Sequence, residues 1–384
     1  MSGPWRAWAE AEAHGIRAAG RWRATRDFDS RDAVAGCLHD GRTLVSFAGN
    51  DYLGLRVHPA VVAAARQALE RWGTGAGAAR LLTGSRPVHG ELEAALAEWK
   101  HAERALLFST GFMANLGVLT ALGGAGTLLL SDERNHASII DGCRLARAEV
   151  AVFPHGDLDA VARLLGRAPR ALVVTEAVFS MDGDLAPLEP LAWLCRRHGA
   201  LLVVDEAHSV LGPEPDLGGA EVLRVGTLSK TLGAMGGFVA GPGPLIELLC
   251  NRARSFVFTT ALPPADAAAA LAAVGVLRSG EGRALRERLR GHVERLAPGH
   301  PSPILPWLLG DERAALAAAH QLEQAGLLVP AIRPPTVPPG SSRLRVGLSA
   351  AHTSDQVAAL AAALARLGAR IAPAAAARQG VARA

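Results

Sequence analysis

Lys230 is the residue whose type and position most directly suggest chemistry. The chain has only two lysines, Lys100 and Lys230, and its other basic residues are arginines. A desolvated lysine can lose its proton and add to a carbonyl carbon, whereas arginine stays protonated. Lys230 lies in a glycine-rich turn, residues 226–237, where a solvated loop lysine is the plainer interpretation. The lysine alone leaves both interpretations open.

Polar residues follow three apolar runs that we expect to be buried strands. Residues 201–204 lead into Asp205 and His208, residues 171–175 into Glu176 and Ser180, and residues 221–225 into the Lys230 turn. In an open parallel sheet the ligand lies outside the carboxyl ends of the strands, so these ends are expected to meet. One such acid more often caps the next helix, and a lone histidine is usually structural. Three ends around one reactive amine instead favour an active site.

Pyridoxal phosphate explains this combination of residues. The cofactor needs a lysine amine, an acid that keeps the pyridine nitrogen protonated, and donors for a phosphate group. Lys230 and Asp205 supply the amine and the acid. Gly111 opens a helix directly after a strand, so backbone N–H groups at Gly111 and Phe112 and the helix dipole face an anion there. The turn at Thr227 supplies further donors.

The elements that position these residues alternate between strand and helix. The apolar patterns predict strands over residues 104–108, 127–131, 149–153, 171–175 and 201–204, and helices over residues 111–122, 136–146, 158–165 and 188–198. This alternation predicts an α/β fold with a mainly parallel central sheet covered by helices on both faces. Helices over residues 281–296, 312–325 and 354–367, with a strand over 343–348, predict a smaller α+β domain.

Four segments are therefore expected along the chain. They are an N-terminal helical arm (1–45), a large cofactor-binding domain (46–275), a small C-terminal α+β domain (276–371) and a disordered Ala/Arg-rich tail (372–384). Lys100, in a predicted helix over residues 91–100, is expected to be a solvated surface residue.

Composition argues against several other classes of protein. The formal charge is +4, but the arginines are scattered among acids and form no basic tract, so nucleic-acid binding is not expected. No apolar run reaches bilayer length, and the N-terminus lacks a secretory apolar region, which predicts a cytoplasmic protein without membrane contact. The four cysteines lie far apart, so neither a metal site nor a disulfide framework is predicted.

Between about Arg21 and Leu367 the chain resembles the α-oxoamine synthases. These are fold-type I pyridoxal-phosphate transferases that join an amino acid to an acyl thioester with loss of carbon dioxide. The segments that carry the resemblance are residues 50–55, 73–77, 83–85, 109–112, 135–138, 175–183, 205–208, 226–237, 343–345 and 349–352. Two departures stand out: residues 75–79 contain more alanine than is usual in the family, and the stretch from His208 to Thr227 is several residues shorter.

The resemblance implies a role for each matching residue. Lys230, His136 and Asp205 would be catalytic, with His136 stacked on the pyridine ring; without the resemblance, His136 reads as a solvent-facing histidine at a helix N-terminus. The family's remaining cofactor positions match Gly111, Phe112, Ser180, His208 and Thr227. Its substrate positions match Arg21, Asn50, His136, Arg333 and Thr336.

Residues 331–338 are similar to the branch of the family that condenses L-alanine with a pimeloyl thioester, carried by coenzyme A or acyl carrier protein. On this interpretation Lys230 removes the α-proton of alanine, Arg333 takes the amino-acid carboxylate, and Arg21 lies near the acyl side. The family also implies a homodimer with its active site at the subunit interface.

Other interpretations remain open at this point. Glycine C-acetyltransferase and 5-aminolevulinate synthase share every cofactor residue named above. A nicotinamide-dependent reductase would need a Gly-x-Gly-x-x-Gly motif after the first strand, which is absent. A non-catalytic partner subunit, such as one half of some serine palmitoyltransferases, would be expected to lack the lysine.

Overall fold

The computed structural model describes residues 3–30, 32–38, 41–168, 170–212, 214–368 and 370–371. The predicted tail over residues 372–384 lies outside the described residues. Within them, no helix has the length and apolar character needed to cross a bilayer.

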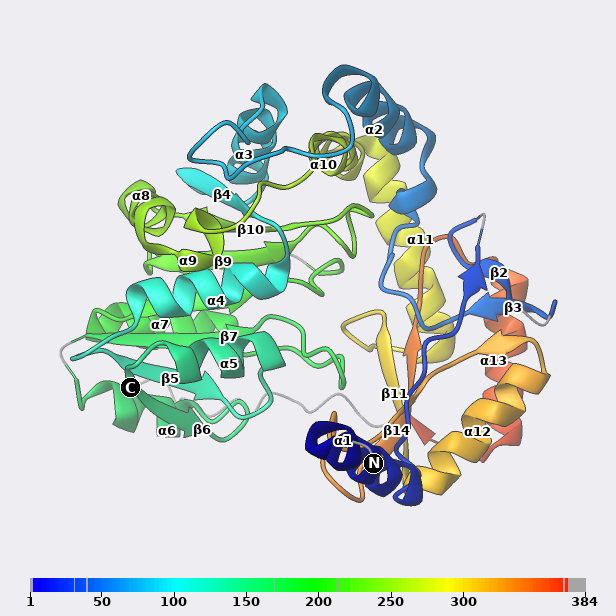
Figure 1. Cartoon of the computed structure of the whole chain (residues 1–384). Helices are drawn as coiled ribbons and strands as arrows, with labels where there is room; N and C mark the ends of the chain where they lie inside the picture. The colour runs from blue at the N-terminus through cyan, green and yellow to red at the C-terminus, as the bar shows by residue number, and fades with distance from the viewer. Residues whose placement is uncertain are drawn as a thin grey trace.

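A seven-stranded sheet forms the centre of the larger part of the molecule, in the order β4-β10-β9-β8-β7-β5-β6 (Figure 1). Its strands are β4 (Arg104–Phe108), β5 (Leu128–Asp132), β6 (Glu149–Phe153), β7 (Ala171–Glu176), β8 (Leu201–Asp205), β9 (Val222–Thr227) and β10 (Gly237–Gly241). Strands β6, β5, β7, β8 and β9 are mutually parallel. The predicted mainly parallel sheet is confirmed.

Strand β10 departs from the predicted pattern because it runs antiparallel to both β9 and β4. A short turn over residues 228–236 joins β9 to β10, whereas a parallel pair needs a longer crossover connection. This turn contains Lys230, so the antiparallel strand holds the lysine at the carboxyl end of β9.

Helices cover both faces of the sheet because its strands are apolar on both sides; every residue of β5, β7 and β10 is buried. The helices of this part are α2 (Pro59–Trp72), α3 (Pro87–Trp99), α4 (Gly111–Leu122), α5 (Ala137–Leu145), α6 (Leu158–Leu165), α7 (Leu188–His198), α8 (Gly243–Arg252), α9 (Arg254–Val257) and α10 (Pro264–Arg278), with a 3₁₀ turn η1 (Leu55–Val57). Helices α2, α3 and α10 gather at one end of the sheet, and α4 and α5 cover the face shown in Figure 1.

The smaller part contains helices and a second, antiparallel sheet in the order β13-β14-β11-β15. Its elements are α11 (Gly280–Leu296), β11 (Ile304–Gly310), α12 (Glu312–Gln324), β12 (Leu327–Leu328), β13 (Ala331–Ile332), β14 (Ser342–Gly347), α13 (Ser354–Arg366) and β15 (Arg370–Ile371). These elements form the other side of the molecule in Figure 1.

The N-terminal region is helical only in α1 (Pro4–Ala18), so the predicted helical arm over residues 1–45 is partly wrong. It continues into the strands β1 (Phe28–Asp29), β2 (Ala35–Leu38) and β3 (Thr43–Ser46). Strand β3 pairs in parallel with β12 of the smaller part. Strand β12 is far from β3 in the sequence, so the hydrogen bonds that it supplies to β3 could not be recognised from the pattern of residues 1–45 alone.

Candidate active site

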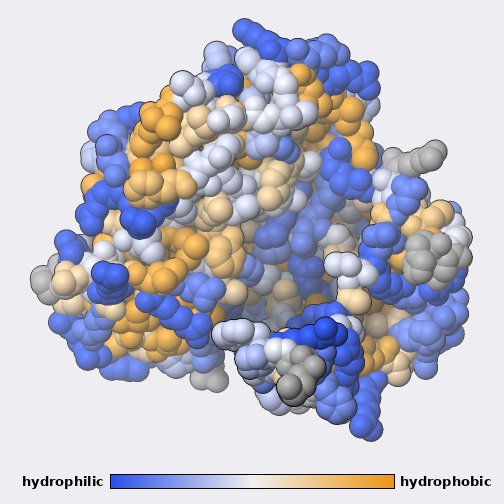
Figure 2. Space-filling model, in the orientation of Figure 1, coloured by the Kyte–Doolittle hydropathy of each residue, from blue (hydrophilic) through white to orange (hydrophobic). Residues whose placement is uncertain are grey.

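The strand ends named in the sequence meet at one edge of the central sheet. Asp205 pairs in register with Glu176 on one side and with Val225 on the other, and β9 continues into the Lys230 turn. In front of this edge the molecule is hollowed between its two parts, and hydrophilic side chains gather in the hollow (Figure 2). The predicted convergence of the three strand ends is thus seen in the structure.

Lys230 has the environment that a reactive amine requires. Burial lowers the pKa of the Lys230 ammonium, and the nearby Arg345 charge lowers it further, while Asp205 and Glu176 act in the opposite direction. Among the described residues, the amine has no hydrogen-bond or ion-pair partner. Lys230 can therefore become a neutral nucleophile or base more easily than a solvated lysine.

Asp205 is held as a buried acceptor at the tip of β8. Only 7% of the residue is exposed. Its Oδ2 accepts a hydrogen bond from Asn115 Nδ2 at 2.7 Å, and its Oδ1 accepts from the backbone N–H of Ala207 at 2.9 Å. The two donors fix the carboxylate plane, which suits an acid that must face a pyridinium N–H.

A short hydrogen-bond chain connects Asp205 to His136. Asn115 Nδ2 also donates to Ser138 Oγ at 2.9 Å, and Ser138 Oγ lies 2.8 Å from His136 Nδ1. Because Ser138 Oγ accepts from Asn115, its own O–H is free to donate to Nδ1. Burial of part of the ring lowers the pKa of His136. We therefore assign a neutral imidazole with its proton on Nε2.

A second buried network surrounds His208. Its Nδ1 lies 2.6 Å from the Tyr52 hydroxyl, which keeps its proton because burial raises its pKa to about 12, and which donates to Asn50 Oδ1 at 3.1 Å. Burial lowers the pKa of His208 well below its ordinary value, with further lowering by the charges of Lys230 and Arg345. The His208 ring is therefore neutral and shares its Nδ1 with the Tyr52 hydroxyl in one hydrogen bond.

Arg345 is a functional candidate that the sequence reasoning did not assign. This buried side chain donates from Nε to the Ser180 carbonyl at 2.6 Å and from Nη2 to Asn50 Oδ1 at 3.1 Å. The segment 343–345 was a marker of the family resemblance, but no role was given to Arg345. The sequence offers one signal that could have identified Arg345. Arginine alternates with Leu344 along β14, and this alternation turns Arg343 and Arg345 to one face of the strand.

Glu176 was noted at a strand end but was not assigned to the site. Burial, and next the negative charge of Asp205, raise the pKa of Glu176 well above its ordinary value. Its Oε1 has no hydrogen-bond partner among the described residues. A protonated carboxyl group therefore lies beside Asp205, where it can donate a hydrogen bond.

The N-terminus of α4 forms a cradle for an anion. Thr110 caps the helix by accepting from Met113 N–H at 3.0 Å, which leaves the N–H groups of Gly111 and Phe112 outside the helix hydrogen bonding. A side chain at Gly111 would lie 3.2 Å from Thr227 Cβ, so glycine keeps the two segments close. Phe112 also meets the edge of the His136 ring at 6.4 Å between centroids.

Two of the substrate residues predicted from the sequence lie with Asp205 and Lys230: Asn50 in the Tyr52–Arg345 network, and His136 in the chain that leads to Asp205. The other three lie together beside the N-terminal arm. Arg21 forms an ion pair with Glu312 at 2.6 Å, and Arg333 Nη1 donates to the Gly20 carbonyl at 2.7 Å. Thr336 is exposed, with Arg23 Nη2 at 3.5 Å from its hydroxyl.

Lys100 was predicted to be a solvated surface residue, and that prediction is wrong. Its side chain is 3% exposed, and its Nζ lies 2.7 Å from Glu206 Oε2. Glu206 and the second acid nearby, Glu214, lie more than a hundred residues further along the chain, so the pattern around Lys100 gives no sign of them.

The arrangement fits pyridoxal phosphate. A desolvated lysine, a fixed carboxylate and an anion cradle at a helix N-terminus are the three features that the cofactor requires. Lys230 would hold its aldehyde carbon, Asp205 its ring nitrogen, and the Gly111–Phe112 backbone with Thr227 its phosphate. His136, Ser180 and His208 remain candidates for contacts with the ring.

The comparisons with known proteins agree with this fit. Residues 42–364 match the aminotransferase class I and II family. The chain is 50% identical, over 94% of its length and 97% of the relative, to an 8-amino-7-oxononanoate synthase of Methylobacterium sp. (strain 4-46). It is 54% identical, over 85% of its length and 86% of the relative, to an enzyme of the same name in Anaeromyxobacter sp. (strain K).

Solved structures show the same relationship. A serine palmitoyltransferase of Sphingomonas wittichii superimposes with a TM-score of 0.87 at 33% identity, covering 94% of this chain and 96% of that one. The 8-amino-7-oxononanoate synthase of Francisella tularensis superimposes with a TM-score of 0.70 at 27% identity, covering 84% and 96%. The chain belongs to the aminotransferase class I and II family and, within it, to the 8-amino-7-oxononanoate synthases.

Proposed function

We propose that this member of the 8-amino-7-oxononanoate synthases condenses L-alanine with a pimeloyl thioester, releasing carbon dioxide and the thiol. The enzyme uses pyridoxal phosphate, as expected from Lys230 and Asp205. The observation that carries the proposal is sequence identity: about half of the residues are identical to those of two enzymes named 8-amino-7-oxononanoate synthase. The site supports it through the Lys230 amine, which has no partner among the described residues and which the charges of Asp205 and Arg345 both influence.

When bound, the cofactor supplies an electron sink for negative charge that develops at the α-carbon of the amino acid. Lys230 then takes the α-proton on its Nζ, for which its lowered pKa suits it. Asp205 would hold the cofactor at its ring nitrogen and keep a proton there, because Asn115 and the Ala207 N–H fix the plane of its carboxylate. The neutral His136 ring offers an Nε2–H donor, and neither it nor the neutral His208 ring adds positive charge beside Lys230.

Alanine must be held by its carboxylate so that only the intended bond to the α-carbon breaks. We assign this role to Arg345 and not to Arg333, because Arg345 is buried and acts electrostatically on Lys230 and His208. Arg345 keeps N–H groups beyond those bonded to Ser180 and Asn50, and a guanidinium can hold a carboxylate with two parallel hydrogen bonds.

The distal carboxylate of the pimeloyl chain fits the basic cluster beside the arm. Arg21 and Arg333 both lower the pKa of Glu312, against the opposing effect of the neighbouring Asp311, and Arg23 is nearby at Thr336, so three guanidinium groups lie near two acids. The cluster therefore holds an excess of positive charge. Such a cluster at the mouth of the hollow attracts a dicarboxylic acyl chain and orients its thioester inward.

Product analysis with purified enzyme tests the proposed function. With pyridoxal phosphate, L-alanine and pimeloyl-coenzyme A, we expect 8-amino-7-oxononanoate, carbon dioxide and free thiol in equal amounts. Parallel reactions with glycine plus acetyl-coenzyme A and with glycine plus succinyl-coenzyme A should be slower by a large factor. Faster turnover of either glycine pair would assign the chain instead to glycine C-acetyltransferase or 5-aminolevulinate synthase activity. Replacing coenzyme A by acyl carrier protein identifies the preferred carrier.

A further inference from the structure

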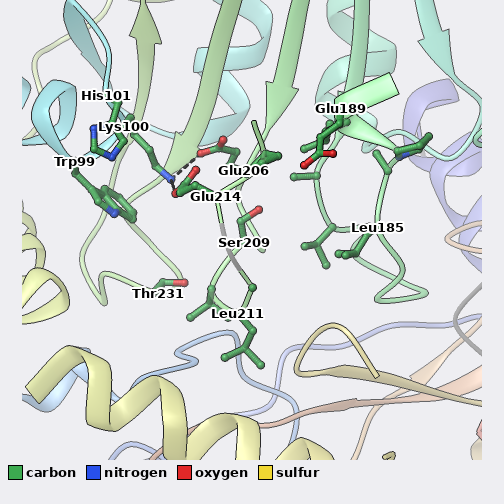
Figure 3. Close-up of a pocket in the computed structure, with 18 of the residues that line it drawn as sticks. Trp99, Lys100, His101, Leu185, Glu189, Glu206, Ser209, Leu211, Glu214 and Thr231 are labelled. Atoms are coloured by element: carbon green, nitrogen blue, oxygen red, sulfur yellow. Dashed lines mark ion pairs between the residues drawn. The ribbon is translucent and has the colours of Figure 1, made fainter. Parts of the chain in front are cut away.

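A cavity of about 940 Å³ lies behind the catalytic residues. It opens between the segments that follow β7 and β8, the C-terminal end of α3, and helix α11 of the smaller part (Figure 3). Trp99 and Lys100 enter from one side and Leu185 and Glu189 from the other, with the Ser209–Leu211 segment crossing between them. A cavity of this size is typical of a small-molecule site.

This cavity is separate from the site described above but shares its backbone. Lys230, Asp205, His208 and His136 do not line it. Four residues of the site are each followed in the chain by a residue that does: Ala177 after Glu176, Glu206 after Asp205, Ser209 after His208, and Thr231 after Lys230. The same short segments thus form the wall between the two sites.

Most charges at the cavity cancel one another. Lys100 pairs with Glu206 at 2.7 Å, and Arg224 contacts both Glu206 and Glu214, the latter at 3.2 Å. Two cations therefore face two acids at one end. Glu189 is exposed, so solvent screens its charge.

Arg286 is the cavity cation that these ion pairs do not neutralise. Its guanidinium is half-buried, and burial lowers its pKa, as does the neighbouring charge of Arg283. Nη1 donates to the Leu277 carbonyl at 3.0 Å, but no carboxylate pairs with Arg286 in the part of the chain that the structure describes. A desolvated guanidinium without a counter-ion favours an anionic ligand.

The remaining walls are mainly apolar and include Val178, Leu188, Val210 and Leu277, while His101, Ser209 and Thr231 also line the cavity. We propose that the cavity binds a small amphipathic anion, an unbranched apolar chain that ends in a carboxylate. The carboxylate pairs with Arg286 and the chain lies along the apolar walls. Ligand contacts with Ala177, Glu206, Ser209 and Thr231 would then act on the segments that carry the catalytic residues.

Octanoate is a suitable probe, with 1-octanol as its uncharged counterpart. Isothermal titration of the cofactor-loaded enzyme should show one saturable octanoate site per chain and binding of 1-octanol at least tenfold weaker. Arg286→Met should weaken octanoate binding at least tenfold, whereas Arg286→Lys should stay within a few-fold of the wild type. Arg313→Met, which removes an exposed arginine from α12, should leave binding unchanged.

Steady-state kinetics separate this cavity from the acyl site. Octanoate should change turnover without competing with either alanine or pimeloyl-coenzyme A. The proposal is overturned by the absence of saturable binding, by equal affinity for 1-octanol, or by competition with the thioester. If Arg286→Met does not fold, the ratio of octanoate to 1-octanol affinity in the wild-type enzyme still decides the outcome.

Discussion

Burial gives the two lysines of this chain opposite properties. Lys100 is almost inaccessible but is neutralised by Glu206, whereas Lys230 is less buried and has no partner among the described residues. An ion pair favours the charged form of an amine, and unpaired burial favours the neutral form. The number of lysines in the sequence drew attention to Lys230, but only the structure distinguishes the two.

Lys230→Ala should abolish turnover and the visible absorption that pyridoxal phosphate shows when it is bound covalently to a lysine. Lys100→Met should keep the absorption, because Lys100 faces away from the site, but should lower the midpoint of thermal unfolding by leaving Glu206 with Arg224 alone. Absorption spectra of both purified variants with added cofactor provide the measurement. Loss of the band in Lys100→Met with retention in Lys230→Ala would show that the wrong lysine has been assigned.

Asn115 should act as a positioning residue because it donates to both Asp205 and Ser138. Asn115→Ala removes one charge-assisted hydrogen bond of about 1.5 to 3 kcal/mol from Asp205, which corresponds to a loss in kcat of roughly 10- to 100-fold. Ser138→Ala should cost less, because it disturbs only the orientation of His136. The exposed Asn251→Ala serves as a control.

A loss in kcat at an unchanged thermal midpoint distinguishes this role from a general loss of stability. Without its Asn115 donor, the carboxylate of Asp205 is no longer held in one plane, so kcat should fall in Asn115→Ala while the protein stays folded. A normal kcat in this variant would mean that the hydrogen-bond chain is only structural.

Arg345 and Arg333 should have separable effects on the two substrates. Arg345→Met is expected to raise the KM for alanine at least tenfold, because it removes the buried guanidinium beside Lys230. Arg333→Met, at the arm, should raise the KM for pimeloyl-coenzyme A and leave that for alanine unchanged. The reverse pattern would restore the expectation from sequence, in which Arg333 holds the amino-acid carboxylate.

At the scale of elements, periodicity predicted the framework well. Strands β4 and β6 and helices α4, α6 and α7 begin and end at the predicted residues, because each is a continuous apolar run or a helical stripe with a clear boundary. Elements that depend on distant partners were missed. Strands β1 to β3 carry no such pattern and are stabilised by pairing with one another and with β12.

The residues proposed to be catalytic divide in the same way, into those marked by local patterns and those that depend on distant contacts. Asp205, His208 and Lys230 could be predicted because strand ends are marked in the sequence. Arg345 and Asn115 act through contacts with residues far away in the chain, such as Ser180 and Asp205. The alternation along β14 marks Arg345 only as one of two arginines on a strand face, and no local pattern marks Asn115. Burial of Lys100 and protonation of Glu176 likewise depend on neighbours brought close only by folding.

An ionic cluster joins three elements near the site and should make stability pH-dependent. His155, just after β6, lies 3.0 Å from Asp132 at the end of β5 and 2.8 Å from Asp184 after β7. Burial alone lowers the pKa of His155, but hydrogen bonds to the two acids outweigh it and raise the pKa to about 9. The unfolded value is near 6.5, so the protonated form favours folding.

This stabilisation is fully present below about pH 6.5 and is lost as pH rises through about 9, with a magnitude on the order of 3 kcal/mol at most. The difference in thermal midpoint between wild type and His155→Gln should therefore be largest near pH 6 and shrink towards pH 10. His320→Gln, at an exposed position in α12, should show no such trend. A difference that grows with pH would contradict the assigned charge of His155.

At the scale of the whole molecule, exposed apolar residues gather beside the anion cradle. Leu82 is 76% exposed and Phe258 is 70% exposed. Their segments lie side by side, because Ala261 N–H donates to the Ala78 carbonyl at 3.0 Å. Ser109 Oγ, next to the cradle, donates to the Thr260 carbonyl at 3.2 Å. A patch of this kind favours a subunit interface at the rim of the active site.

We therefore expect a homodimer whose second subunit covers this rim. Introducing Leu82→Asp and Phe258→Asp together should convert the dimer to a monomer, measured by light scattering, because two charges would be buried at the interface. Turnover should fall with dimer content and recover in part at high protein concentration. Val152→Asp places the same charge on an equally exposed residue of the edge strand β6, 63% accessible, and should leave the dimer and its activity intact. A monomeric double variant with full activity would show that each subunit holds a complete site, and a persistent dimer would place the interface elsewhere.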